Sequence, residues 1–212
     1  MNIKKIGVIG AGQMGNGIAH VLSLGGYKVI INDIDEGILR EASQKIKINL
    51  ERQINSQKIS IDESHAALKL INYSVSLEDF SDVDLVIEAA TEDESTKQKI
   101  ISSLLPHIQE HTILTSNTSS ISITRLASCT DRPEKFMGFH FMNPVPVMQL
   151  VELIRGIATD QDTYQSCLEV VEKLGKTAAS SEDFPAFIVN RILMPMINEA
   201  VYALYEGVGS VE

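Results

Sequence analysis

Short apolar runs alternate along the chain with longer segments in which apolar residues recur at helical spacing. The short runs predict strands at residues 5–9, 28–32, 84–89, 112–116, 136–141 and 150–154. The longer segments predict helices at residues 14–24, 35–57, 94–105, 163–174 and 188–205. Because strands separated by helices build βαβ units, the pattern predicts an α/β fold with a Rossmann-type, doubly wound and mostly parallel sheet.

The composition is that of an ordinary globular chain, with 44% hydrophobic and 22% charged residues among 212. The formal net charge of −10 argues against nucleic acid as a partner. No apolar run approaches the ~20 residues that cross a bilayer, and the glycine motif near the start leaves no room for a signal peptide. Cys129 and Cys167 form no metal-like or disulfide framework, so we expect a cytoplasmic protein with no metal site and no membrane contact.

Residues 10–15 read GAGQMG and match the G-x-G-x-x-G pattern between the first predicted strand and the first predicted helix. In this context Gly10 permits a tight turn, Gly12 lets the backbone approach a pyrophosphate, and Gly15 allows close packing of helix on strand. The first helical turn then offers free N–H groups to the phosphates. The expected contacts to the dinucleotide in this loop are Gly10, Gly12, Gln13, Met14 and Gly15.

Asp33 follows the second predicted strand, 23 residues after Gly10. A carboxylate at this place hydrogen-bonds a ribose 2′-hydroxyl and repels a 2′-phosphate, so NAD is favoured over NADP. The alternative is a glycine turn with an unrelated surface aspartate. Strand, loop, helix and acid all agree with the first interpretation, which predicts an NAD-binding domain.

His140 and Glu152 lie inside two apolar runs, FMGFHF and LVELI, which are joined by MNPVPVMQ. We expect Pro144 and Pro146 to keep this connection extended and rigid, so that the two strands are neighbours and His140 faces Glu152. The carboxylate would fix the imidazole tautomer and leave the other nitrogen free to accept a proton. A core histidine with a satisfied hydrogen bond and a separate surface glutamate fit the pattern as well.

A nicotinamide site shifts this balance, because removing hydride from an alcohol carbon requires a base for the hydroxyl proton. The other histidines lie in helical or polar stretches, at His20, His65, His107 and His111. We therefore interpret His140 as the general base and Glu152 as the carboxylate that orients it.

Five stretches together resemble the L-3-hydroxyacyl-CoA dehydrogenase family, which includes the bacterial 3-hydroxybutyryl-CoA dehydrogenases. They are VIGAGQMGNGIA (8–19), IEAATED (87–93), TSNTSSISIT (115–124), GFHFMNPVPVMQLVE (138–152) and FIVNRILMPMINEA (187–200). The resemblance implies NAD-dependent oxidation of an L-3-hydroxyacyl-CoA to the 3-ketoacyl-CoA, or the reverse, with His140 and Glu152 as the acid–base pair.

The resemblance also implies roles for further residues. Ser119 and Asn190 match the family's contacts to the reacting oxygen, and Asn143 matches a contact near the acyl-CoA thioester. On the cofactor side, the matching residues are Asp33, Glu92, Lys97 and Asn117.

Each of these transfers has a structural alternative. Ser119 and Asn117 fit a turn or cap before a helix, because Ser and Asn favour such positions. Glu92 fits a solvated helix start in the charged run TEDEST, and Asn190 fits an N-cap. The segment 35–59 is locally about neutral to slightly basic and is either a mixed-charge solvated helix or a contact for the CoA nucleotide.

The family's members continue into an all-helical C-terminal domain that forms their dimer interface. We divide this chain into an NAD-binding domain, residues 1–186, and the start of that helical domain, residues 187–212. The family-type dimer is therefore not predicted here, and another homo-oligomer stays open. Two alternatives to a 3-hydroxyacyl-CoA dehydrogenase are an NAD-binding fragment without turnover and a dehydrogenase of free hydroxyacids.

Overall fold

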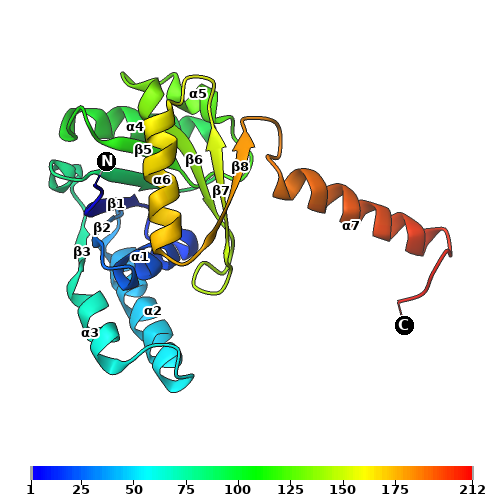
Figure 1. The fold of residues 1–212 in the computed structure, drawn as a ribbon, viewed down its shortest axis with the longest axis horizontal. Coiled ribbons are helices and arrows are strands. Elements are labelled where there is room, and N and C mark those ends of the chain that lie inside the picture. Colours follow the sequence, from blue (N-terminus) through cyan, green and yellow to red (C-terminus); the bar gives the residue numbers. More distant parts are fainter. Residues whose placement is uncertain (1, 212) are drawn as a thin grey trace.

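The computed structural model describes residues 2–211, which fold around a single eight-stranded sheet (Figure 1). The strand order is β3-β2-β1-β4-β5-β6-β7-β8. Neighbouring strands from β3 to β6 run parallel, whereas β7 is antiparallel to β6 and β8 is parallel to β7. The predicted α/β fold with a mostly parallel, doubly wound sheet is confirmed.

The predicted elements agree with the observed ones to within a few residues. The strands are β1 (Lys5–Ile9), β2 (Lys28–Asn32), β3 (Ile71–Ser74), β4 (Leu85–Glu88), β5 (Ile113–Ser116), β6 (Phe136–Phe141), β7 (Leu150–Arg155) and β8 (Thr177–Glu182). The α-helices are α1 (Gln13–Leu24), α2 (Glu36–Asn55), α3 (Ile61–Lys69), α4 (Glu94–Leu104), α5 (Ile123–Ala127), α6 (Gln161–Lys173) and α7 (Val189–Tyr205).

Several helices begin at an acidic residue whose side chain accepts a hydrogen bond from the first helical turn. Asp35 accepts from the N–H of Gly37 at the start of α2, at 2.6 Å. Asp93 does the same for α4, where the N–H of Thr96 donates at 2.8 Å. Such caps satisfy backbone groups that the helix leaves unpaired, and each stabilises its helix by about 1 kcal/mol.

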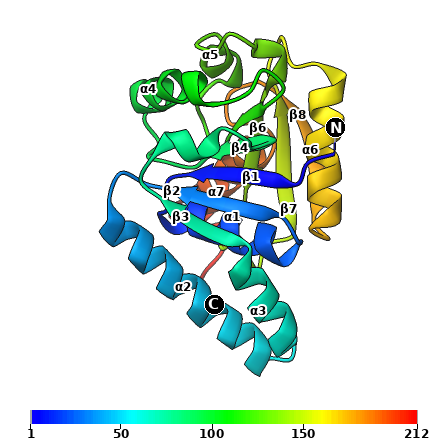
Figure 2. The ribbon, with the colours of Figure 1, turned by 90° about the vertical axis from the view of Figure 1, so that its left-hand side faces the viewer.

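Two hydrophobic cores lie on opposite faces of the sheet. One contains apolar side chains of α1, α2 and α6, and the other contains side chains of α4 and α5. Figure 2 shows α2 and α3 at the end of the molecule opposite α4 and α5. With a core on both faces, every residue of β6 is buried, including His140. The sheet therefore holds this histidine on a rigid, covered element.

Two α-helices, α3 and α5, and two strands, β3 and β8, were absent from the sequence prediction. The connection between β6 and β7 also differs from the extended link that was predicted. It is a tight turn, in which the carbonyl of Pro144 accepts the N–H groups of Val147 and Met148, both at 3.0 Å. The Asn143–Pro144 peptide bond in this turn is cis.

Helix α7 extends away from the rest of the molecule (Figure 1). None of its residues is buried, and its exposed apolar side chains include Ile192, Met196, Val201 and Tyr205. The backbone reaches α7 through two residues with positive φ, Ala186 and Phe187. No helix within residues 2–211 has the length and apolar character needed to cross a membrane.

Candidate active site

The candidate residues gather where the parallel strands end at their carboxyl ends. The glycine loop follows β1, Asp33 follows β2, and the loops after β4 and β5 carry the next candidates. In open α/β sheets, ligands bind in the crevice outside these strand ends, at the point where the strand order reverses. Here that point lies between β1 and β4, which are neighbours in the sheet.

The glycine loop has the geometry that a dinucleotide requires. Gly10 has a φ of +93°, and a Cβ there would lie 2.7 Å from the carbonyl oxygen of Ala89. A Cβ on Gly15 would lie 1.7 Å from the carbonyl oxygen of Gly10, whereas one on Gly12 would meet nothing within 4 Å. The space over Gly12 is thus open, and α1 begins there with exposed Gln13 and half-buried Met14. This arrangement fits a pyrophosphate above the loop.

Asp33 links the glycine loop to the end of β2. Its Oδ2 accepts the N–H of Ala11 at 2.8 Å, and its Oδ1 accepts the N–H of Asp35 at 3.3 Å. The side chain therefore lies beside the glycine loop, and its contact with a ribose stays a prediction from its spacing.

His140 and Glu152 are directly opposite each other on β6 and β7. The Nδ1 atom of His140 lies 2.7 Å from Oε2 of Glu152, and both side chains are buried. An ionised carboxylate only accepts hydrogen bonds, so Nδ1 carries the proton and Nε2 is the free basic nitrogen. The antiparallel pairing of the two strands thus produces the facing pair that the sequence predicted.

The second oxygen of Glu152 binds the start of α7. Its Oε1 accepts the N–H groups of Ile188 at 3.0 Å and Val189 at 2.8 Å. Ile188, the N-cap residue of α7, gives no side-chain cap, so Glu152 supplies it from β7. Burial opposes ionisation of Glu152, but the hydrogen bonds from His140 and these two amides outweigh it and lower the pKa of the carboxyl group.

Ser119 lies in the loop after β5, where Glu92 binds the backbone and the hydroxyl groups. Oε1 of Glu92 accepts the hydroxyl of Thr118 at 2.6 Å, the N–H of Ser119 at 2.8 Å and the hydroxyl of Ser119 at 3.1 Å. Burial by itself raises the pKa of the Glu92 carboxyl group. The hydrogen bonds from Thr118 and Ser119 outweigh this effect, so the pKa lies below its usual value. The N-cap of α5 is Ser122, so Ser119 is not a helix cap.

Two asparagines connect the strand ends to each other and to the glycine loop. Oδ1 of Asn117 accepts the backbone N–H of Phe141 at 2.9 Å, which ties the loop after β5 to β6 next to His140. Oδ1 of Asn143 accepts the side-chain amide of Gln13 at 3.1 Å. The β6–β7 turn and the first residue of α1 are therefore in direct contact.

Asn190 is the second residue of α7 and does not cap it. Its side-chain amide donates to the backbone carbonyl of Ser119 at 3.3 Å. The first turn of α7 thus contacts both the Ser119 loop and, through Glu152, the histidine.

The side chain of Lys97 is buried and ion-paired, unlike the open cofactor contact that the resemblance led us to expect. Its side chain is 1% exposed, and its ammonium group lies 2.8 Å from Oε1 of Glu88 and 3.6 Å from Oε2 of Glu92. Sequence analysis did not select Glu88. Its only signal there was a carboxylate at the end of an otherwise apolar strand, in the stretch LVIE.

Two hollows lie near these elements. One, of about 460 Å³, is bounded by the first half of α1, one side of α2 and the β6–β7 turn. Its lining includes Lys45, Asn49, Arg52, Asn143 and Pro144. It therefore places the basic residues of α2 opposite Asn143.

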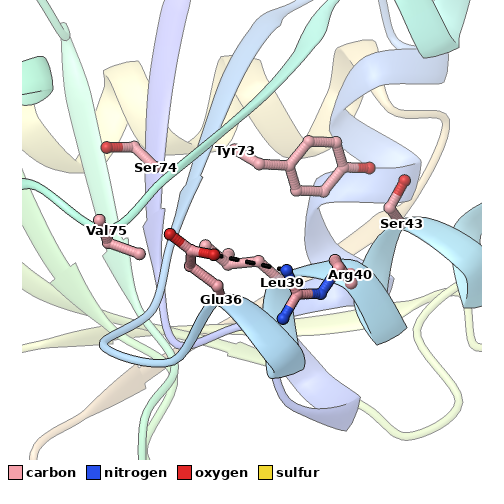
Figure 3. A pocket seen from close by; sticks show the side chains of 7 residues that line it. All are labelled: Glu36, Leu39, Arg40, Ser43, Tyr73, Ser74 and Val75. Carbon is pink, nitrogen blue, oxygen red and sulfur yellow. Dashed lines mark hydrogen bonds and ion pairs between the residues drawn. The ribbon is translucent and has the colours of Figure 1, made fainter.

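The other hollow, of about 360 Å³, lies between α2 and the end of β3 (Figure 3). Arg40 pairs with Glu36 along the α2 side of this hollow at 3.4 Å, and the ring of Tyr73 points toward Ser43. None of the predicted site residues lines it. Within residues 2–211, no group of three or more His, Cys, Asp or Glu side chains is arranged to hold a metal ion.

Residues 5–184 match the family model for the NAD-binding domain of 3-hydroxyacyl-CoA dehydrogenase. The chain belongs to the 3-hydroxyacyl-CoA dehydrogenase family. This membership makes it an NAD-dependent oxidoreductase, and NAD is its cofactor.

Named relatives of the 3-hydroxyacyl-CoA dehydrogenase family cover almost the whole chain. A 3-hydroxybutyryl-CoA dehydrogenase of Bradyrhizobium diazoefficiens is 58% identical over 99% of this chain and 72% of its own length. A probable 3-hydroxybutyryl-CoA dehydrogenase of Bacillus subtilis is 44% identical over 100% of this chain and 74% of its own. The crystal structure of (S)-3-hydroxybutyryl-CoA dehydrogenase from Ralstonia eutropha has a TM-score of 0.96 at 43% identity, covering 99% of this chain and 74% of that one.

Proposed function

We propose that the chain catalyses the reversible, NAD-dependent oxidation of a short L-3-hydroxyacyl-CoA, such as 3-hydroxybutyryl-CoA, to the 3-ketoacyl-CoA. The observation that carries this proposal is the 2.7 Å contact between His140 and Glu152, near the end of β6 and the start of β7, whose connecting turn contacts the first residue of α1. The names of the relatives, several of them 3-hydroxybutyryl-CoA dehydrogenases, support the substrate class.

The proposed proton transfer runs through Nε2 of His140. In the oxidative direction Nε2 takes the proton of the substrate's 3-hydroxyl group, and bound NAD supplies the hydride acceptor. Glu152 stabilises the imidazolium that results, because it is an ionised, buried carboxylate in contact with Nδ1. In the reductive direction the imidazolium returns this proton to the forming alcohol oxygen.

Ser119 and Asn190 are proposed to hold the reacting oxygen. Their link is a hydrogen bond from the Asn190 amide to the Ser119 carbonyl, so the two side chains belong to one local unit. The Ser119 hydroxyl donates to Glu92 in this structure. It would have to turn from Glu92 toward the substrate oxygen in order to act.

The 460 Å³ hollow is proposed to receive part of the CoA moiety. It brings Lys45 and Arg52 of α2 opposite Asn143, the residue expected near the thioester. Both basic side chains can pair with phosphate oxygens, and arginine does so bidentately. The segment 35–59 is then a substrate contact in a chain that is otherwise acidic.

The decisive experiment is oxidation of NADH by the full chain in the presence of acetoacetyl-CoA. Consumption of NADH with acetoacetyl-CoA but not with free acetoacetate supports the proposal. Equal rates with both substrates would favour a dehydrogenase of free hydroxyacids. Tight NADH binding without consumption would favour an NAD-binding fragment.

A variant carrying Lys45→Ala and Arg52→Ala tests the CoA contact. Losing two cation–phosphate pairs should raise the KM for acetoacetyl-CoA by about tenfold or more, with little change in kcat or in the Kd of NADH. Lys47→Ala, an exposed residue of α2 that does not line the hollow, is the matched control. An unchanged KM in the double variant would refute this placement of CoA.

We also propose that a second, helical unit starts at residue 187, following an NAD-binding domain of residues 1–186. The exposed apolar surface of α7 and its extension from the sheet support this division (Figure 1).

A further inference from the structure

Glu88 is a carboxylate buried at the end of β4, between the glycine loop and the Ser119 loop. Its side chain is 3% exposed. It accepts four hydrogen bonds: two from the ammonium group of Lys97 at 2.8 and 2.9 Å, one from the N–H of Ala90 at 2.8 Å, and one from the hydroxyl of Ser116 at 2.6 Å. All its acceptor positions are thus used, as a buried charge requires.

These bonds join three segments that border the active site. Ala90 belongs to the loop after β4, Lys97 to α4, and Ser116 to the last position of β5. The backbone carbonyl of Glu88 adds a fourth link, because it accepts the N–H of Asn117 at 2.7 Å. Glu88 therefore fixes the start of the loop that carries Ser119.

Ion pairs provide a second connection between Glu88 and Ser119. Lys97 is held by Glu88 and stands 3.6 Å from Oε2 of Glu92. The other oxygen of Glu92 binds the N–H and hydroxyl groups of Ser119 and of Ser120, at 2.8 to 3.2 Å. The contacts thus run from the Glu88 carboxylate through the Lys97 ammonium group and the Glu92 carboxylate to the Ser119 hydroxyl. Glu88 and Lys97 are buried, whereas the side chain of Glu92 is 40% exposed.

We propose that Glu88 is a positioning residue, which holds Lys97 and the 116–120 loop so that Ser119 lies where its hydroxyl can turn from Glu92 to the reacting oxygen. The catalytic part of this inference rests on the proposed function, since it assumes that Ser119 contacts the substrate. The position of the 116–120 loop does not depend on the proposed function and can be measured without turnover.

The first test is hydrogen–deuterium exchange of the full chain in the segment 117–121. Glu88→Gln keeps the size of the side chain but removes its charge, so exchange at Ser119 and Ser120 should rise by about tenfold. Glu94→Gln is the matched control, because it also removes one negative charge, but from a side chain at the start of α4 that pairs with Arg125 and Gln98 rather than with Lys97. Equal exchange in wild type, Glu88→Gln and Glu94→Gln would overturn the proposal.

A double variant separates positioning from simple stability. Glu88→Gln with Lys97→Met removes both charges and so restores folding if the single variant is too unstable to study. If Glu88 positions the loop, this double variant regains stability but keeps fast exchange at Ser119. If both stability and slow exchange return, the ion pair is merely structural and the proposal fails.

Kinetics with acetoacetyl-CoA provide the second readout. Glu88→Gln should lower kcat by about tenfold or more, because Ser119 would no longer be held at the place from which its hydroxyl reaches the reacting oxygen. Adding Ser119→Ala should lower kcat no further than Ser119→Ala alone. Additive losses would overturn the proposed route through Ser119. A wild-type chain without turnover would refute the proposed function, while the exchange experiment would still decide the placement.

Discussion

Replacing Glu152 with glutamine removes one charge from a fully buried side chain and barely changes its volume. The carboxylate accepts three donors: Nδ1–H of His140 on one oxygen, and the N–H groups of Ile188 and Val189 on the other. A carboxamide has only one oxygen, so it cannot satisfy both sides. Its NH₂ group must face either His140 or the two amides.

Both orientations are costly, but they affect different properties. With the oxygen toward Ile188 and Val189, the NH₂ group faces Nδ1, which must then become the acceptor. The proton moves to Nε2, and the histidine can no longer take a proton from the substrate. With the oxygen toward His140, two backbone donors face an NH₂ group, and helix α7 loses its cap. The first orientation keeps both hydrogen-bonded sides satisfied, so it is favoured.

The expected loss follows from the tautomer. A carboxylate that fixes the histidine tautomer in a catalytic pair contributes about 10³–10⁴ in turnover, equivalent to about 4–5.5 kcal/mol of barrier. We therefore expect Glu152→Gln to lower kcat with acetoacetyl-CoA by this factor. The Kd of NADH should stay within about threefold, because β4, β5 and β6 separate β7 from β1 and β2, the strands that lead into the glycine loop and Asp33.

The assay combines NADH oxidation at saturating acetoacetyl-CoA with fluorescence titration of NADH. Glu182→Gln, an exposed residue at the end of β8, controls for the loss of one negative charge near this sheet edge. A Glu152→Gln variant with kcat within tenfold of wild type would refute the tautomer argument. A loss of NADH binding equal to the loss of turnover would show that the effect is not specific to proton transfer.

Two further predictions concern the cofactor loop and acid stability. Gly12→Ala should weaken NADH binding by about tenfold or more without changing the unfolding midpoint, because the new methyl group meets nothing within 4 Å but enters the space expected for pyrophosphate. Gly15→Ala should instead lower the unfolding midpoint, because its methyl group would lie 1.7 Å from the carbonyl oxygen of Gly10. Equal midpoints for the two variants would contradict the loop geometry. The pKa of Glu152 lies below its usual value of 4.5, so its ionised form stabilises the fold fully above that pH, and this contribution is lost as pH falls through the folded-state pKa. Urea unfolding should therefore show the stability difference between wild type and Glu152→Gln narrowing below about pH 4.5, and a difference that stays constant down to pH 3 would count against this linkage.

The sequence predicted most of the sheet because its buried strands are continuous apolar runs. Strand β8 was missed because TAASSE contains no such run, and only Ser181 in it is buried. This strand forms because β7 offers it a full ladder, from Leu150 opposite Thr177 to Arg155 opposite Glu182. Backbone pairing at a sheet edge leaves no side-chain pattern to read.

The candidate site was predictable to a similar degree. The facing of His140 and Glu152 followed from two apolar runs joined by a short connection, although the connection is a turn rather than an extended link. The dual role of Glu152 was not predictable, because backbone amides far along the chain bear no sequence signal. Glu88 was missed for a related reason, since a buried charge is recognised only when its partner, Lys97, is known to be near.

The shared carboxylate of Glu152 makes the base and the helix mechanically dependent on each other. Helix α7 meets the sheet through a short turn, and its first two N–H groups hold the same side chain that fixes the tautomer of His140. A rotation of α7 that breaks those two bonds frees one carboxylate oxygen and changes how firmly the histidine is held. A molecule that packs on the exposed apolar side chains of α7 and shifts this helix would therefore also shift the carboxylate that contacts His140. Under the proposed function, proton transfer at His140 would therefore depend on whether α7 keeps its two hydrogen bonds to Glu152.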